Sequence, residues 1–148
     1  MAATQNVKNG DAADLAAVTA TSFTGPLTGN VTGNVTGNVV GEVRNGTQTL
    51  TATGAITIDN GTVFLSHATV AIVTAIPAPT AGDRILIVDS SASGTAAHVV
   101  TTTGATVNTT GNNTLTLNAP DESIELVASS ATRWHIIANN NSVALSTV

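Results

Sequence analysis

Few residues in this sequence have side chains suited to acid–base, nucleophilic or metal chemistry. The three histidines, His67, His98 and His135, stand about 30 residues or more apart and form no metal-binding motif such as His-x-His or His-Glu-x-x-His. A histidine at a threefold axis could still bind a metal together with its symmetry copies. We expect instead that each histidine makes ordinary polar contacts in or beside a strand.

Serine and carboxylate chemistry has equally little support. No serine lies in a Gly-x-Ser-x-Gly turn, and no glycine-rich loop continues into the Lys-Ser/Thr of a phosphate site. We expect the acids near strand ends to be solvated caps rather than a catalytic pair, namely Asp59, Asp83, Asp89, Asp121, Glu122 and Glu125. Calcium at Asp59-Asn60-Gly61 or at Asp121-Glu122 is the alternative, with an incomplete ligand series. We therefore predict a protein that is not an enzyme and has no cofactor and no metal.

The composition excludes several classes of partner. Of 148 residues, 9% are charged, and the formal net charge is −5. The basic residues Lys8, Arg44, Arg84 and Arg133 are dispersed, so we expect no nucleic-acid binding. Cysteine is absent, which excludes disulfides and thiolate zinc sites. No apolar run reaches about 18 residues and the first residues do not resemble a signal peptide, so we expect neither membrane contact nor secretion.

A four-residue repeat dominates the first third of the chain. From Thr24 the sequence reads TGPL-TGNV-TGNV-TGNV-VGEV. Side chains alternate between the two faces of an extended chain, so the glycines and aliphatic residues of this repeat share one face. We expect that face to contact other polypeptides through Leu27, Gly29, Val31, Gly33, Val35, Gly37, Val39 and Val43.

A single extended segment cannot bury its own apolar face. Glycine between successive valines permits close backbone approach, as where several copies meet near an axis. We predict that residues 1–44 form an extended N-terminal arm covered by other chains, and that residues 45–148 form a compact β domain. A flexible Gly/Thr/Asn linker is the alternative, but the regular aliphatic face argues against it. A short helix over Asp11–Val18 is possible within the arm.

The second part of the chain reads as short strands separated by turns. The pattern predicts an all-β fold, an antiparallel jelly roll or β-sandwich with a small barrel as the alternative, and a type I′ hairpin at Asn60-Gly61. The expected strands cover residues 47–53, 55–59, 63–66, 69–75, 84–89, 97–103, 114–118, 123–128, 133–138 and 142–147.

Trp134 is the residue that we most clearly expect to pack in the core. In the expected strand, Trp134 and Ile136 share one face, and we expect both in the core. A role for Trp134 in an interface or in stacking on a ligand is the alternative. Aromatic residues make up 2% of the chain, so the core has mainly small aliphatic side chains. Such a core is commonly supplemented by oligomerisation.

Two segments resemble parts of known virion proteins. The TGNVTGNVTGNV tract resembles repeat segments of tailed-bacteriophage tail-fibre and other virion proteins. The second half is similar to a β-rich module of phage and cyanophage structural proteins, in which a "g-d-x-I-x-I-x-D" strand opens the sheet and an "x-W-x-I-x-x-N" strand nearly closes it. The matching strands are Gly82–Asp89 and the one containing Trp134. Together these segments cover most of the chain.

The resemblance implies a non-enzymatic virion structural protein that forms a homotrimer. One placement is a capsid decoration (cement) protein on the outer capsid surface, bridging capsomers and binding the major capsid protein. The other is a short tail fibre or spike that attaches to host glycans. We expect decoration, because we take the chain to be complete, it is short for a fibre, and it lacks an aromatic-rich binding tip. A bacterial surface adhesin would need an export signal that we do not find.

Overall fold

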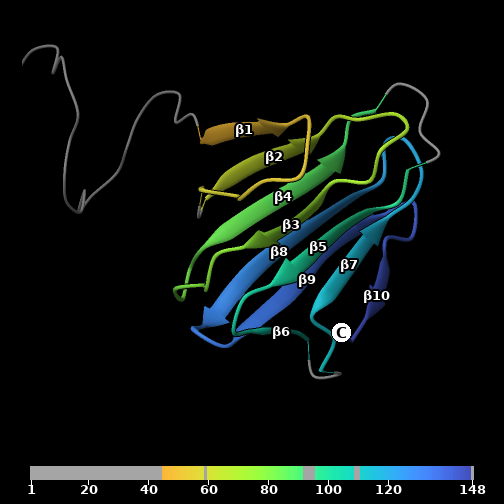
Figure 1. Cartoon of the computed structure of the whole chain (residues 1–148). Helices are drawn as coiled ribbons and strands as arrows, with labels where there is room; N and C mark the ends of the chain where they lie inside the picture. Colours follow the sequence, from red (N-terminus) through yellow and green to blue (C-terminus); the bar gives the residue numbers. More distant parts are fainter. Residues whose placement is uncertain (1–44, 59, 92–95, 109–110, 148) are drawn as a thin grey trace, which may run out of the picture. The chain divides into compact units, whose positions relative to one another are not determined.

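The structure, a computed structural model, describes residues 45–58, 60–91, 96–108 and 111–147. In these ranges the chain forms strands and no helix, which confirms the all-β expectation (Figure 1). None of the described segments is a helix that could cross a membrane. The strands are β1 (Gly46–Leu50), β2 (Gly61–Leu65), β3 (Val73–Ile76), β4 (Arg84–Asp89), β5 (His98–Thr102), β6 (Thr106–Val107), β7 (Thr114–Leu117), β8 (Ser123–Ser130), β9 (Arg133–Asn140) and β10 (Ala144–Ser146).

The strands form two sheets that enclose one core. The first has six strands in the order β1-β2-β4-β8-β9-β6, and the second has four in the order β10-β7-β5-β3. From β2 to β8 the chain alternates between the sheets, so each strand is followed by a strand of the other sheet. Between β2 and β8, two successive strands of one sheet are therefore connected through a strand of the other sheet.

This alternation produces parallel pairs without helices. Parallel neighbours need a long crossover, which is usually a helix. Here β3 is the crossover between the parallel strands β2 and β4, and β4 is the crossover between the parallel strands β3 and β5. The expectation of antiparallel pairing is therefore wrong for these pairs, and also for β1–β2 and β6–β9. The pairs β4–β8, β8–β9, β5–β7 and β7–β10 are antiparallel, so both sheets are mixed.

The expected hairpin at Asn60-Gly61 is also wrong. Gly61 is the first residue of β2, and it lies opposite Gly46, the first residue of the parallel strand β1. The connection between β1 and β2 is therefore a wide coil rather than a tight turn. Part of this coil, 55–58, was expected to be a strand. Its backbone is held instead by the Gln48 amide, which donates to the Ala55 carbonyl and accepts from the Thr57 N–H.

The core follows the period-two alternation of the strands. In β2, β4 and β8 every second residue is buried, as expected for strands with one face on a core. Trp134 of β9 is one of the largest fully enclosed side chains. The aliphatic residues of the core include Val63, Leu65, Ile85, Ile87, Ile124 and Leu126 from the first sheet, and Ile76, Val100, Leu115 and Leu117 from the second.

Candidate functional site

The residues expected to contact partners lie outside the described part of the chain. They are Leu27, Gly29, Val31, Gly33, Val35, Gly37, Val39 and Val43, and the possible helix over residues 11–18 lies outside it as well. The same holds for Asp59, one of the possible calcium ligands. The described chain begins at Asn45, directly before the edge strand β1.

Trp134 is enclosed by the first sheet and is not a surface residue. It is 2% exposed, and in the sheet it lies opposite Ala128 of β8 and Val107 of β6. Its indole Nε1 has no hydrogen-bond partner among the described residues. Ile136 is partly buried and packs against the same core. Trp134 is therefore placed to fill volume in the core, and its ring is closed to a ligand that would stack on it.

The three histidines lie in separate environments. His67 shapes the turn before β3, because its Nδ1 accepts the backbone N–H of Val70. His135, on β9, forms a hydrogen bond of 2.8 Å with the Ser129 hydroxyl. His98, at the start of β5, is fully buried. No group of three or more His, Cys, Asp or Glu residues capable of holding a metal occurs within the described ranges.

A buried polar cluster links the end of β4 to the start of β5. Asp89 Oδ1 accepts the Ser91 N–H at 2.9 Å and the Ser91 hydroxyl at 2.5 Å. His98 Nε2 lies 3.7 Å from the same oxygen, and His98 Nδ1 accepts the Ile72 N–H at 3.0 Å. Because Nδ1 accepts, the proton of the neutral ring is on Nε2, which faces Asp89. The expectation that acids at strand ends are solvated is therefore wrong for Asp89.

The cluster contains the residue types of a hydrolase triad without the order of contacts that a triad needs. A nucleophilic serine donates its proton to a histidine, which a carboxylate orients. Here the Ser91 hydroxyl donates to Asp89, and both Asp89 and His98 are completely buried. The arrangement positions the backbone on both sides of the β4–β5 connection and joins it to Ile72, before β3. Sequence spacing gave no sign of it, because Asp89 and His98 meet only through the fold.

Glu122 is the second acid that differs from the expectation. It is 3% exposed, and its carboxylate Oε2 accepts the backbone N–H groups of Asn118 and Ala119. It therefore fixes the turn between β7 and β8. Its neighbour Asp121 is exposed and has a positive φ of 64°. Oε2 of Glu122 is thus bound by backbone N–H groups, and no set of three or more His, Cys, Asp or Glu residues in the described ranges includes this pair as a possible metal site.

One ion pair lies on the outer face of the six-stranded sheet. Arg84 Nε of β4 donates to Glu125 Oε1 of β8 at 2.6 Å. The hydrogen bond to Glu125, followed by the charge of that carboxylate, raises the pKa of Arg84. The pair is exposed, so water screens it, and pairs of this kind contribute little to stability.

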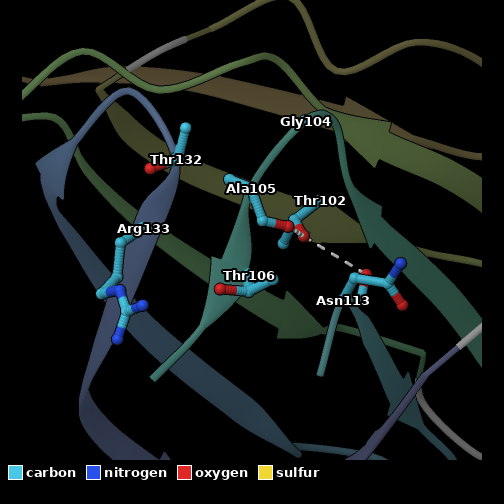
Figure 2. Close-up of a pocket in the computed structure, with 7 residues that line it drawn as sticks. All are labelled: Thr102, Gly104, Ala105, Thr106, Asn113, Thr132 and Arg133. Atoms are coloured by element: carbon cyan, nitrogen blue, oxygen red, sulfur yellow. Dashed lines mark hydrogen bonds between the residues drawn. The ribbon is translucent and has the colours of Figure 1, made fainter. Parts of the chain in front are cut away.

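An open hollow of about 410 Å³ lies where the β5–β6 and β8–β9 turns meet (Figure 2). Its polar lining includes Thr106, Thr132 and Arg133, and β6 pairs with β9 so that Thr106 lies opposite Arg133. Figure 2 shows the Thr106 hydroxyl pointing toward the strand that carries Arg133. The Arg133 guanidinium makes no ion pair with any described residue. The hollow is shallow and hydroxyl-rich, and Arg133 is the one charged residue in its lining.

Charged side chains are sparse on the described surface and absent from one sheet. The four strands of the second sheet contain no Asp, Glu, Lys or Arg. The register aligns Val73, Val99, Thr116 and Ala144 in one row across all four strands. Val73 is 50% exposed, so this row lies on the outer face. The charged residues that reach the described surface are Asp83, Arg84, Asp121, Glu125 and Arg133.

No protein-family model matches this chain, and no curated protein matches it closely enough to serve as a relative.

Proposed function

We propose that this chain is a non-enzymatic virion structural protein. In this proposal it is a capsid decoration (cement) protein that forms a homotrimer and uses its N-terminal arm to bridge and stabilise capsomers. Its partners are further copies of itself and the major capsid protein, and its location is the outer surface of the capsid.

The observation that carries this proposal is the uncharged outer face of the four-stranded sheet. A protein that works alone in solution usually carries many charges of both signs on its surface. Protein–protein interfaces are instead depleted of charge at their centre. A whole sheet face of Val, Ala, Thr and Ser, without one ionisable side chain among its exposed positions, supports a protein that works within an assembly.

The polar clusters of the described residues support the same proposal. Asp89, His98 and Glu122 are buried, and each contributes to holding a connection between strands. Trp134 fills the core. The buried side chains that could in principle take part in acid–base chemistry thus hold the backbone in place instead. This suits a mechanical role.

A decoration protein acts by mass action. A ligand that binds only the assembled shell lowers the free energy of that shell, and many weak contacts add up when they are linked. Each copy therefore needs only modest contacts with the capsid, provided that the trimer presents several of them together.

The proposal is tested with the full chain and with a variant that lacks residues 1–44. Light scattering should give the mass of a trimer for the full chain, which should also bind purified particles that lack it. The shortened variant should keep a cooperative thermal transition and lose particle binding. Undiminished binding of the shortened variant would reject the role of the arm, and a monomeric full chain without particle binding would reject the proposal.

The hollow at Arg133 favours one alternative, a tail fibre or spike component that attaches to host glycans. A guanidinium that has no ion-pair partner in the described part of the chain, next to threonine hydroxyls, suits the carboxylate of an acidic sugar. This alternative predicts that acidic oligosaccharides perturb the NMR signals of Thr106 and Thr132, and that Arg133→Ala abolishes the effect. Neutral oligosaccharides are the matched control.

A further inference from the structure

We propose that the open edge of β1 binds the TGNV segment of a neighbouring copy as an additional parallel strand. The inference rests on the proposed trimer and deepens it, because it names the surface that the arm contacts. The occupant is the segment around Asn30–Val35 of a second copy of this chain.

The β1 edge has the properties of an unfinished sheet. β1 is the terminal strand of the six-stranded sheet, and among the described strands it pairs only with β2. An edge strand presents unpaired N–H and C=O groups that can pair with another chain. The hydrophobic core is also incompletely covered at this edge. Leu50 of β1 and Ile58 of the following coil pack against the core but are only partly buried. A further strand would cover apolar surface that the described residues leave accessible.

The start of β2 shows how closely a parallel strand can approach in this sheet. Gly61 of β2 has φ of 137°, and the Gly46 carbonyl oxygen occupies the place that a Cβ on Gly61 would need. Glycine is therefore required at position 61 because β1 lies against it. Gly46 is under no such constraint: its φ is not positive, and its hypothetical Cβ would make only ordinary contacts, with the Asn60 carbonyl oxygen at 3.7 Å and Ile58 Cγ2 at 3.9 Å. The close approach is therefore confined to the β2 side of β1, and no described residue occupies the other edge.

The sequence around these glycines repeats in register. Asn45-Gly46-Thr47 precedes β1's Leu50 with the same spacing as Asn60-Gly61-Thr62 precedes Leu65. The register places Gly46 opposite Gly61 and Leu50 opposite Leu65. The arm contains the same spacing in Asn30-Val31-Thr32, followed by Val35. A strand formed by this segment and aligned on its Asn-x-Thr would place Val35 beside Leu50.

The occupant is a segment of a neighbouring copy, because the chain's own arm lacks the side chains that would stabilise a coil leading back to its own β1. To pair in parallel with its own β1, the arm would have to make a full coil like the one between β1 and β2. That coil is held by the Gln48 amide, which bonds Ala55 and Thr57, and by Thr53, whose hydroxyl accepts the Val73 N–H. At the position equivalent to Gln48, one coil earlier, the arm has Gly33, which has no side chain. Exchange between copies avoids this coil.

Exchange of this kind also fits a closed ring. Each copy offers one edge and donates one segment, which makes a head-to-tail contact. Head-to-tail contacts close into rings when the rotation between copies allows it. Three such contacts would complete the proposed trimer.

The test uses disulfide formation in a chain that has no natural cysteine. Asn34→Cys and Thr49→Cys are made in separate full-length chains that differ in tag length. The two chains are unfolded, mixed, refolded together and oxidised. On the register above, Asn34 of one copy lies beside Thr49 of the next. The expected main covalent product is the mixed dimer, identified by mass spectrometry of the linked peptides.

Two controls define the background. Ser129→Cys places an exposed thiol on β8, away from the β1 edge, and should give severalfold less mixed dimer with Asn34→Cys. Val35→Asp, added to the Asn34→Cys chain, should leave the thermal transition in place and lower the yield of mixed dimer severalfold, because it places a carboxylate beside the apolar Leu50. Equal yields in either control would overturn the inference.

The remaining outcomes are equally informative. A double variant, Asn34→Cys with Thr49→Cys, that oxidises only within one chain would show that the arm returns to its own β1. Asn34→Cys that links mainly to itself would show that arms pair with arms. Either result rejects the exchange. A trimer by light scattering without the mixed dimer rejects this edge and leaves the proposed function standing. If the mixed dimer forms but the protein does not bind particles, the inference about this edge stands and the proposed function is rejected.

Discussion

The carbonyl oxygen of Gly46 stands where a side chain on Gly61 would have to begin. The two residues are register partners in parallel strands, and Gly61 has φ of 137°, a conformation that favours glycine. Gly61→Ala should therefore lower the free energy of unfolding by about 3 kcal/mol, combining backbone strain with an overlap against main-chain atoms. Urea unfolding of residues 45–148 measures the change.

Gly54 supplies the matched control for that substitution. Its hypothetical Cβ would meet only ordinary contacts, with the nearest atoms at 3.9 Å. Gly54→Ala should change the free energy of unfolding by no more than about 0.5 kcal/mol. Equal losses for the two variants would mean that the approach of β1 to β2 is looser than the structure shows.

The Ser91 hydroxyl should contribute more to stability than that of its neighbour Ser90. Ser91 donates to the buried carboxylate of Asp89, whereas Ser90 is exposed and makes a 3.3 Å contact with the Leu65 carbonyl. Ser91→Ala removes a donor from a fully buried acceptor that water cannot reach, so it should cost about 2 kcal/mol. Ser90→Ala should cost about 0.5 kcal/mol or less. Denaturant unfolding of the two variants side by side measures the difference, and similar values would contradict the role given to the cluster.

The sequence anticipates the strands that are short β-branched and aliphatic runs between turn signals. The strand at 84–89 is predicted with its observed bounds, because Ile-Leu-Ile-Val lies between a turn signal that ends at Gly82 and another that begins at Ser90. β6 was missed, since two residues are too few to form a pattern. The parallel pairing was not predictable from local signals. It follows from the alternation of the chain between the two sheets. This alternation is a property of the whole chain and cannot be predicted from any single segment.

The polar clusters show the same limit. Asp89 was expected to be solvated because acids at strand ends usually face water. In the structure it is enclosed, because Ser91 turns back onto it and His98 returns from the next strand. Neither contact with Asp89 can be inferred from the spacing of these residues along the sequence. The hollow at Arg133 was also missed, because its lining comes from two turns whose residues are ordinary threonines and one arginine.

The single tryptophan gives a direct test of the core. Trp134 is 2% exposed, so its fluorescence in the native protein should be emitted at short wavelength and should resist quenching by iodide. Unfolding in urea should shift the emission to longer wavelength and raise the quenching constant severalfold. Native emission that iodide quenches as strongly as free tryptophan would contradict the enclosed position, and would favour the alternative role in stacking on a ligand.

Thermal stability should depend on protein concentration in the full chain but not in residues 45–148. If neighbouring copies exchange segments, association stabilises the native state, and mass action raises the midpoint of unfolding as concentration increases. A fragment that lacks the arm cannot exchange it, so its midpoint should stay constant over the same range. Val35→Asp should weaken the dependence in the full chain, because it places a charge beside Leu50 of the neighbouring copy and changes no residue of 45–148. Calorimetric scans at several concentrations make the comparison, and a full chain whose midpoint is independent of concentration would mean that the arm adds no association between copies.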